Sequence, residues 1–322
     1  MHTACKVDTP RSKPSNFSTA AVDDRGSKTQ PRMDAISAVT NRGFVMRLLA
    51  GKKKNDQANR LRKLTAQQGS SNGDNAVSTI VVLGAKGGVG TTSLTWRLTQ
   101  SLTAEHTPLA IDAHLWQPDL ARVAGMISQT GPGLASVLAG DAAAADAVQI
   151  GDGPALLPGE WTATVNHDTE QFSDRLQNHL IPDLGKRFSA VVIDGGPVRS
   201  PWAMPLCSSA SLVLLVVTAD ELSLLGGYSF AKELAANSEP PPVRVVVNHC
   251  AGETHGRATH TRLRDACREH LDMQVLLAGW LAHDPRMAIR TEPPIPLMRP
   301  LARRVSEAIV ESKTNTSTAK AA

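Results

Sequence analysis

Short, continuous apolar runs alternate with longer helix-patterned stretches from about residue 76 onward. Continuous rather than alternating hydrophobicity is typical of strands buried on both faces, as in parallel sheets covered by helices. The runs span residues 77–83, 109–111, 155–157, 190–193, 212–218, 243–247 and 275–277. The pattern therefore predicts an α/β fold, a doubly wound and mostly parallel sheet flanked by helices, over residues 76–312, followed by a polar tail at 313–322.

Residues 1–75 differ from this body in both pattern and charge. They hold 14 Lys and Arg against 6 Asp and Glu, whereas the remaining residues hold 20 against 24. The first thirty are polar and show no periodic apolar pattern, which is typical of disorder. We therefore expect a mostly disordered basic arm with short helices and a mildly acidic body. Such a body is not expected to bind nucleic acid.

The sequence shows no sign of secretion or of a membrane span. No apolar run approaches the ~18 residues that a spanning helix needs, and the first residues form no apolar signal segment. The four cysteines form no CxxC pair, which favours free thiols in a cytoplasmic protein. Residues 44–54 join an apolar stretch to three lysines. They are either a marginal helix in the arm or a peripheral contact with the inner membrane or the cell pole.

A glycine-rich turn follows the first predicted strand and leads directly into a helical pattern. Backbone N–H groups in such a turn, together with the helix N-terminus, can surround an anion. Thr92 stands where the hydroxyl of a phosphate-binding loop would contact Mg²⁺. The predicted phosphate-binding residues are Lys86, Gly87, Gly88, Val89, Gly90, Thr91, Thr92 and Ser93.

Residues 86–90, Lys-Gly-Gly-Val-Gly, resemble the deviant Walker A motif of the MinD/ParA family of P-loop ATPases. Further along, Ile111-Asp112-Ala113-His114 resembles the switch I segment, 191–197 the Walker B and switch II segment, and 245–248 the strand whose last Asn reads adenine. The resemblance covers about residues 77–312.

That resemblance implies bound ATP or ADP with Mg²⁺ and a nucleotide-dependent homodimer. It places the metal at Thr92, Asp112 and Asp194, and the adenine at Asn248. The resemblance assigns catalytic roles to Lys86, Asp112 and His114. The early lysine of this family, here Lys86, reaches the phosphates of a partner subunit, and Asp112 and His114 belong to the segment that resembles switch I.

Two departures put hydrolysis in question. The family's P-loop lysine is replaced by Thr91, and the second switch I aspartate by His114. A neutral threonine cannot stabilise charge on the transferred phosphate, which is the main device of phosphoryl-transfer catalysis. The sequence predicts nucleotide binding with slow or absent ATP hydrolysis.

The arm carries a second resemblance. Residues 56–62, Asp-Gln-Ala-x-x-Leu-Arg, are similar to the DQAxxLR motif of FlhG (FleN, YlxH), a MinD-like regulator of flagellar number and placement. This implies that Asp56, Gln57, Ala58, Leu61 and Arg62 contact an FlhF-like, SRP-type GTPase. Two alternatives remain open: a CpaE/TadZ-like pseudo-ATPase scaffold for pilus or polar localisation, and MinD/ParA positioning of a division site or DNA cargo.

Residues 255–270 combine histidines, a cysteine and interleaved arginines. His255, His260, Cys267 and His270 are irregularly spaced for a metal site, and four arginines lie among them. The pattern favours a solvated basic helix over a metal centre. A contact between this helix and DNA is the less favoured alternative.

Overall fold

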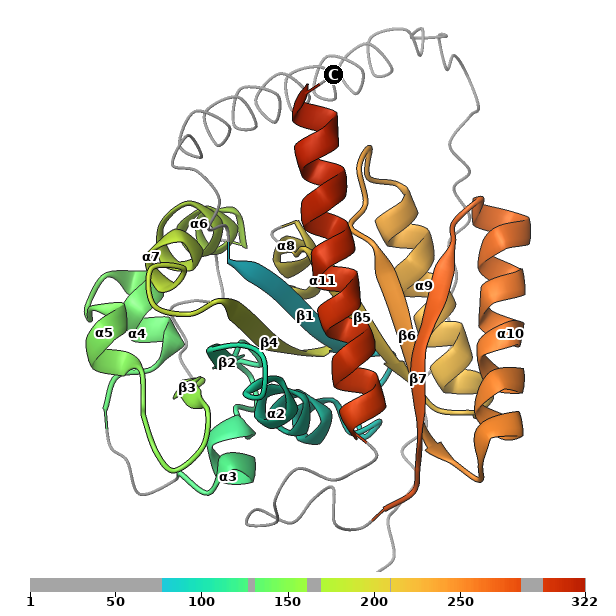
Figure 1. Cartoon of the computed structure of the whole chain (residues 1–322), viewed down its shortest axis with the longest axis horizontal. Coiled ribbons are helices and arrows are strands. Elements are labelled where there is room, and N and C mark those ends of the chain that lie inside the picture. The colour runs from blue at the N-terminus through green and yellow to red at the C-terminus, as the bar shows by residue number, and fades with distance from the viewer. Residues whose placement is uncertain (1–76, 127–130, 161–168, 209, 285–297, 322) are drawn as a thin grey trace, which may run out of the picture. The chain divides into compact units, whose positions relative to one another are not determined.

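A computed structural model describes residues 77–126, 131–160, 169–208, 210–284 and 298–321. The arm, including the segment 44–54 and the motif at 56–62, lies outside these residues. In the described part of the chain, seven strands form one parallel sheet in the order β3-β2-β4-β1-β5-β6-β7 (Figure 1). The strands are β1 (Ser78–Gly84), β2 (Pro108–Asp112), β3 (Ala155–Leu157), β4 (Ala190–Pro197), β5 (Leu212–Val217), β6 (Val243–Cys250) and β7 (Val275–Ala282). All seven predicted strands are confirmed, with several extended at their carboxyl ends.

Helices connect the strands in the alternation expected of a doubly wound fold. One continuous helical stretch, 169–184, contains a π-helical turn. The helical segments are α2 (Thr91–Leu102), α3 (Leu120–Ala124), α4 (Leu134–Ala139), α5 (Ala144–Ala147), α6 (Thr169–Arg175), η2 (Leu176–Leu180), α7 (Ile181–Leu184), α8 (Ala203–Cys207), α9 (Glu221–Ala235), α10 (Glu253–Leu271) and α11 (Met298–Ala321).

Successive residues of the central strands point into opposite layers of the core. In β1, Ile80 and Val82 pack in the layer that contains apolar residues of α2 and α11. Val81 and Leu83 face the other layer, which contains apolar residues of α4, α9 and α10. Figure 1 shows α2 and α11 crossing in front of the sheet. Burial on both faces explains the continuous apolar runs in the sequence.

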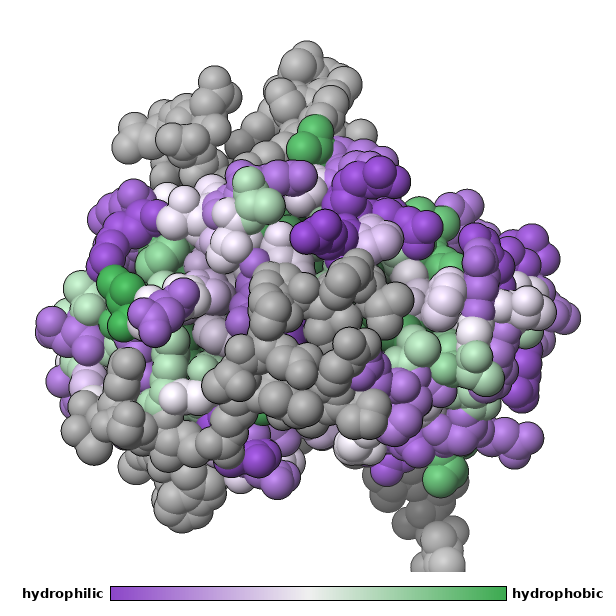
Figure 2. Space-filling view, turned by 60° about the horizontal axis from the view of Figure 1, so that its bottom comes forward, coloured by the Kyte–Doolittle hydropathy of each residue, from purple (hydrophilic) through white to green (hydrophobic). Residues whose placement is uncertain are grey.

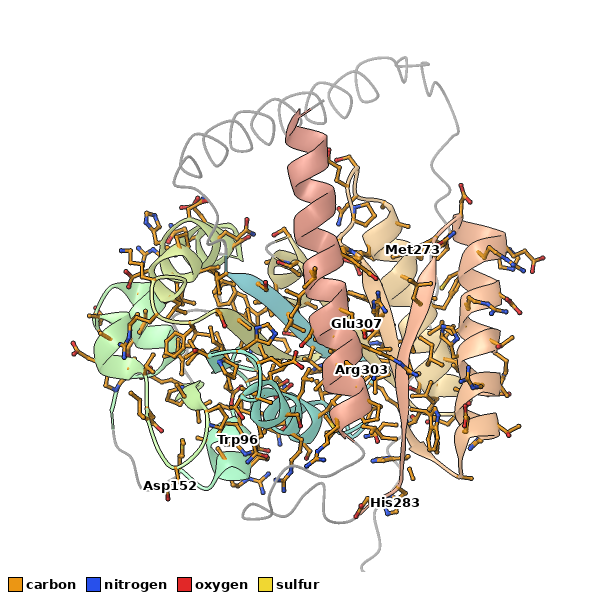
Figure 3. All side chains as sticks on the ribbon, viewed as in Figure 1. Trp96, Asp152, Met273, His283, Arg303 and Glu307 are labelled. Carbon is orange, nitrogen blue, oxygen red and sulfur yellow. The ribbon has the colours of Figure 1, made fainter. Side chains whose placement is uncertain are left out.

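Helix α11 closes the front layer. Its apolar stripe is buried, as expected for a helix that packs on the sheet: Leu301, Val305, Ala308 and Ile309. Its outer face carries the ion pair Arg303–Glu307 (Figure 3). The helical backbone continues to Ala321, through most of the segment predicted to be a polar tail. Among the described helices, none combines the length and apolarity that crossing a bilayer requires.

The parallel order brings the carboxyl ends of the strands to one edge of the sheet. There Asp112 of β2 stands directly beside Asp194 of β4 in the strand register. The end of β1, at Gly84, is paired with β5 at Val216. In open α/β sheets, ligands bind in the crevice at this edge. Every site residue predicted from the body of the sequence lies at this edge, in the loops that leave it or in the first turn of α2.

Candidate nucleotide-binding site

The glycine-rich loop runs from the end of β1 to the start of α2. Gly88 (φ 78°) and Gly90 (φ 88°) adopt the left-handed backbone conformation that favours glycine. Gly90 is the residue that precedes α2, and no side chain caps that helix end. The first N–H groups of a helix have no partner within the helix, so they are available to an anion.

Two buried carboxylates lie beside this loop. Asp112 is 1% exposed and Asp194 is 0% exposed. Asp112 accepts hydrogen bonds from the backbone N–H of His114 (3.1 Å) and of Leu120 (2.9 Å). Oδ1 of Asp194 accepts from the N–H of Gly196 at 3.0 Å, while its buried Oδ2 has no hydrogen-bond partner among the described residues.

The electrostatics of this pair favour a bound cation. Burial, reinforced by the charge of Asp194, raises the pKa of Asp112 well above its ordinary value. Burial also raises the pKa of Asp194, and the neighbouring Thr92 hydroxyl opposes that shift. Carboxylate and hydroxyl oxygens are the ligands that Mg²⁺ prefers, and Mg²⁺ sites generally use one or two carboxylates with phosphate oxygens. The orphaned Oδ2 and the adjacent Thr92 therefore fit Mg²⁺.

Thr91 occupies the position of the missing P-loop lysine. It is 9% exposed, and its hydroxyl fills the inside of the loop so closely that a Cβ on Gly84 would collide with it. Its carbonyl accepts a hydrogen bond from the Thr95 hydroxyl at 3.0 Å. The interior of the loop thus holds a neutral hydroxyl instead of a cation.

Lys86 is held on the same chain. Its Nζ lies 3.0 Å from Oδ1 of Asp220, the residue that caps the N-terminus of α9. The Thr218 hydroxyl, and then Lys86, hold the pKa of Asp220 at about 2. In this structure the predicted catalytic lysine therefore points to α9 of the same chain.

His114 lies with the two carboxylates, as the sequence predicts. Its imidazole is half-buried against Gly196, whose φ is +68°. A Cβ on Gly196 would come within 2.6 Å of the His114 Cδ2, so this contact requires glycine. His114 also lies close enough to Asp194 to lower the pKa of that carboxyl.

Asn248 is placed under the loop. It is 4% exposed, and its side-chain amide donates a hydrogen bond to the Val89 carbonyl at 2.8 Å. The same Nδ2 would lie 2.6 Å from a Cβ on Gly90. In this structure the Asn248 side chain therefore holds the glycine-rich loop through the Val89 carbonyl. Its contact with adenine stays a prediction.

Helix α9 is the part of the site that the motifs did not reveal. Its Gly226 approaches the Ala85 carbonyl so closely that a Cβ there would collide with it. Oδ1 of Asp220 accepts from the Ser223 N–H at 3.1 Å. The signal in the sequence was Asp220 three residues before Ser223, a typical helix start after a buried strand.

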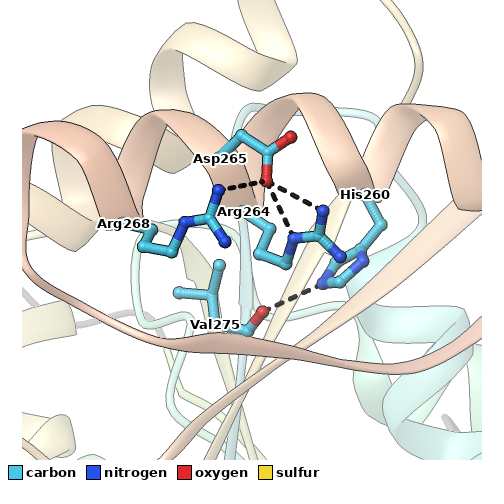
Figure 4. Close-up of polar contacts among 5 residues, drawn as sticks. All are labelled: His260, Arg264, Asp265, Arg268 and Val275. Atoms are coloured by element: carbon cyan, nitrogen blue, oxygen red, sulfur yellow. Dashed lines mark hydrogen bonds and ion pairs between the residues drawn. The ribbon is translucent and has the colours of Figure 1, made fainter.

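The histidine- and arginine-rich segment forms α10, away from this loop. His260 is buried, with its Nε2 2.9 Å from the Val275 carbonyl oxygen, and burial lowers its pKa, so the neutral ring donates to that carbonyl (Figure 4). Asp265 pairs with Arg264 at 2.8 Å and lies 3.7 Å from Arg268. No group of three or more metal-ligating side chains forms within the described ranges. These contacts favour the interpretation of α10 as a solvated, ion-paired helix.

Figure 2 turns the lower end of the view in Figure 1 toward the reader. Among its coloured residues, polar and charged groups dominate and apolar ones are scattered. Elsewhere, a shallow hollow is lined by residues of the α9–β6 and α10–β7 connections, among them Pro241 and Met273. It lies at the opposite ends of the strands, so it contributes nothing to the loop and carboxylates described above.

Comparisons with known proteins define the fold. No protein-family model matches the sequence, and no curated protein matches it. Solved structures do match. The septum site-determining protein MinD from Pyrococcus horikoshii, complexed with Mg-ADP, has a TM-score of 0.58 at 20% identity, covering 73% of this chain and 98% of that one.

Two further solved structures match this chain over a similar share of its length. The Cyanothece McdA(D38A)–ATP complex has a TM-score of 0.59 at 18% identity, covering 73% of this chain and 97% of that one. A ParA family ATPase from Chlorobium tepidum has a TM-score of 0.55 at 19% identity, covering 73% of this chain and 98% of that one. The described domain therefore has the fold of MinD/ParA-type ATPases, the P-loop fold that the motifs predicted.

Proposed function

We propose that this protein is a nucleotide-responsive regulator that binds ATP or ADP with Mg²⁺ and hydrolyses ATP slowly or not at all. One observation carries the proposal. The glycine-rich loop opens α2 directly beside two buried carboxylates, one of which has an unpartnered oxygen. The similarly folded MinD and McdA structures were solved with Mg-ADP and ATP, which supports the same ligand class here.

The loop amides from Lys86 to Ser93 would bind the phosphates, while Thr92, Asp112 and Asp194 would hold Mg²⁺. When bound, Mg²⁺ would supply charge neutralisation for the phosphates. Asn248 keeps the loop in shape through its bond to the Val89 carbonyl. The half-buried His114 is the side chain next to the carboxylates that could orient a water molecule.

Slow hydrolysis follows from the charges inside the loop. Thr91 brings no cation to the phosphates, and the loop's one lysine, Lys86, is paired with Asp220. Removing even one preorganised hydrogen-bond donor from a catalytic site costs about 10²–10³ in rate. A protein with this site is suited to changing its binding partner with the nucleotide that it holds. One such partner is a second copy of the chain, in a nucleotide-dependent homodimer.

The partner proposal rests on the arm. The DQAxxLR-like residues 56–62 precede a domain with the MinD/ParA fold, as in FlhG. We therefore propose control of flagellar number or placement through an FlhF-like GTPase, in the cytoplasm, with peripheral membrane contact through residues 44–54. A peptide of residues 50–70 should stimulate GTP hydrolysis by that partner. Absence of stimulation by both the peptide and the full chain would contradict the partner proposal.

A second candidate is favoured by the loop itself. A threonine in place of the P-loop lysine resembles the altered loops of CpaE/TadZ proteins, which implies a scaffold for pilus or polar localisation. Such a scaffold would have no effect on the GTPase. The same assay therefore separates the two candidates.

Isothermal titration of the full chain with Mg-ATP and Mg-ADP tests nucleotide binding. We expect binding of at least one nucleotide. Replacing Asp194 by Asn should weaken Mg²⁺-dependent binding at least tenfold, because it removes one of the two buried charges beside the metal position. The matched control Asp174→Asn, at an exposed position of α6, should change nothing. Failure of the wild type to bind either nucleotide would contradict the proposal.

A further inference from the structure

The carboxylate of Asp112 is contacted from three directions. Its Oδ1 accepts a hydrogen bond from the N–H of His114 at 3.1 Å, and its Oδ2 accepts one from the N–H of Leu120 at 2.9 Å. The third contact is with Gly159, two residues after the end of β3. A Cβ on Gly159 would lie 2.8 Å from Cγ of Asp112 and 3.0 Å from its backbone oxygen. Gly159 is thus the contact that reaches this carboxylate from a different strand.

The need for glycine at position 159 is a matter of space. Its φ is not positive, so the backbone conformation alone does not require glycine. An added Cβ would also lie 2.7 Å from Cβ of Pro118, whose ring is rigid. Ordinary contacts begin near 3.4 Å, so alanine at this position would drive the Asp112 carboxyl carbon and residue 159 apart by about 0.6 Å. Glycine therefore lets the chain lie directly against the carboxyl group.

The segment around this glycine is bonded to the start of α4 on both sides (Figure 1). Before the glycine, the Pro158 carbonyl accepts from the N–H of Leu134 at 2.8 Å. After it, Oε2 of Glu160 accepts from the N–H groups of Gly133 at 3.0 Å and Ser136 at 3.1 Å, as a capping side chain does. The Ser136 hydroxyl donates to the same oxygen at 2.8 Å. Because bonds on both sides hold the segment, a side chain added to the glycine would displace the facing carboxylate.

We propose that Gly159 is a positioning residue for the proposed metal site. It allows the Asp112 carboxylate the position that Mg²⁺ requires, and the Glu160 cap on α4 keeps it there. The inference rests on the proposed function, because it needs Asp112 to hold Mg²⁺ beside a bound nucleotide. Mg²⁺ requires nearly octahedral geometry with ligands at about 2.0–2.1 Å, whereas Ca²⁺ accepts irregular geometry at about 2.3–2.6 Å. A displaced carboxylate should therefore weaken Mg²⁺ binding more than Ca²⁺ binding.

The experiment measures how much each metal raises the affinity for ATP. Full-length wild type, Gly159→Ala and the control Gly153→Ala are titrated with ATP in Mg²⁺, in Ca²⁺ and in EDTA. For Gly159→Ala we expect the gain from Mg²⁺ to fall about tenfold, a loss typical of changing a group that orients a metal ligand, and the gain from Ca²⁺ to fall less. Affinity in EDTA should stay the same. Gly153→Ala should match wild type, because its Cβ would lie 3.7 Å from the Trp96 ring, an ordinary contact.

Two variants of Glu160 test the cap. Glu160→Ala removes every bond from this side chain to α4, so the gain in ATP affinity from Mg²⁺ should fall. Glu160→Gln keeps a carbonyl oxygen that can accept from the same N–H groups, so it should retain most of that gain. Thermal unfolding shows whether each variant folds. If Gly159→Ala does not fold, the contrast between the two Glu160 variants decides the inference.

The outcomes separate this inference from the proposed function. Equal losses for Gly159→Ala in Mg²⁺, Ca²⁺ and EDTA would overturn the inference, because they would show general damage to the site. An unchanged gain from Mg²⁺ in Gly159→Ala or in Glu160→Ala would overturn it too. Both results leave the proposed function standing when the wild type binds ATP more tightly with Mg²⁺. Wild type that gains nothing from Mg²⁺, or binds no nucleotide, would refute the proposed function and this inference with it.

Discussion

The contact between α9 and the P-loop gives a prediction whose magnitude follows from two adjacent glycines. A Cβ on Gly226 would collide with the backbone carbonyl oxygen of Ala85 and would lie 3.1 Å from its carbon. The three atoms nearest to a Cβ on Gly227 would be side-chain carbons of Val217, Leu215 and Leu263, at 3.3–3.4 Å. Both glycines lie inside the same helix, so alanine at either position gains the same helix propensity, about 1 kcal/mol.

The two substitutions should therefore differ in how much they destabilise the fold. Overpacking typically costs about 1–3 kcal/mol, and a backbone carbonyl cannot rotate away as a side chain can. For Gly226→Ala we expect a net loss of about 1–2 kcal/mol in the free energy of unfolding, whereas Gly227→Ala should change it by less than about 1 kcal/mol. In a domain of this size, each kcal/mol shifts Tm by about 2–4 °C.

The assay is denaturant and thermal unfolding of both variants, followed by Mg-ATP titration. Because Ala85 belongs to the glycine-rich loop, Gly226→Ala should also weaken nucleotide binding, while Gly227→Ala should not. A Gly226→Ala variant as stable as Gly227→Ala, with unchanged ATP affinity, would refute the tight coupling of α9 to the loop.

Three further predictions concern the polar contacts of the site. Without Mg²⁺, Asp194→Asn should raise the free energy of unfolding, because it removes a buried charge next to Asp112. A lower free energy of unfolding in a denaturant titration would contradict this. The low pKa of Asp220 contributes stability above the unfolded pKa near 3.9, and this stability is lost as the pH falls toward about 2. Asp220→Asn should therefore flatten the pH dependence of Tm below about pH 4, and an unchanged profile would count against the contacts of Asp220 with Thr218 and Lys86. Asn248→Ala leaves the Val89 carbonyl without its hydrogen-bond donor. The loss should lower the free energy of unfolding by about 1–3 kcal/mol and weaken tripolyphosphate binding. A variant with wild-type stability would show that this hydrogen bond does not hold the loop.

The sheet could be predicted from the sequence because burial on both faces leaves an unambiguous pattern. The runs that lead into Asp112 and Asp194, residues 109–111 and 190–193, are both continuously apolar and buried. Parallel order then brings their terminal carboxylates to one edge. The loop followed from its glycines, since the left-handed φ values of Gly88 and Gly90 are those that glycine adopts at little cost.

The contacts that depend on exact side-chain directions could not be predicted. The sequence places Asn248 at the end of β6 but does not show that its amide turns back under the loop. It marks Lys86 as a family lysine but cannot show its pairing with Asp220, more than a hundred residues away. The approach of Gly226 to Ala85 depends on the packing of α9, which no local pattern encodes. Such long-range contacts arise from tertiary packing and leave little trace in local propensity.

The central claim is that this loop binds nucleotide but has lost the charge that drives hydrolysis. The direct test measures Mg-ATP binding, ATP turnover and dimerisation of the wild type beside Thr91→Lys, which restores a cation at the buried position now filled by a hydroxyl. The account predicts that wild type binds ATP with little turnover and that Thr91→Lys raises turnover about tenfold or more. Rapid hydrolysis by the wild type, or a Thr91→Lys variant that changes neither turnover nor dimerisation, would contradict it.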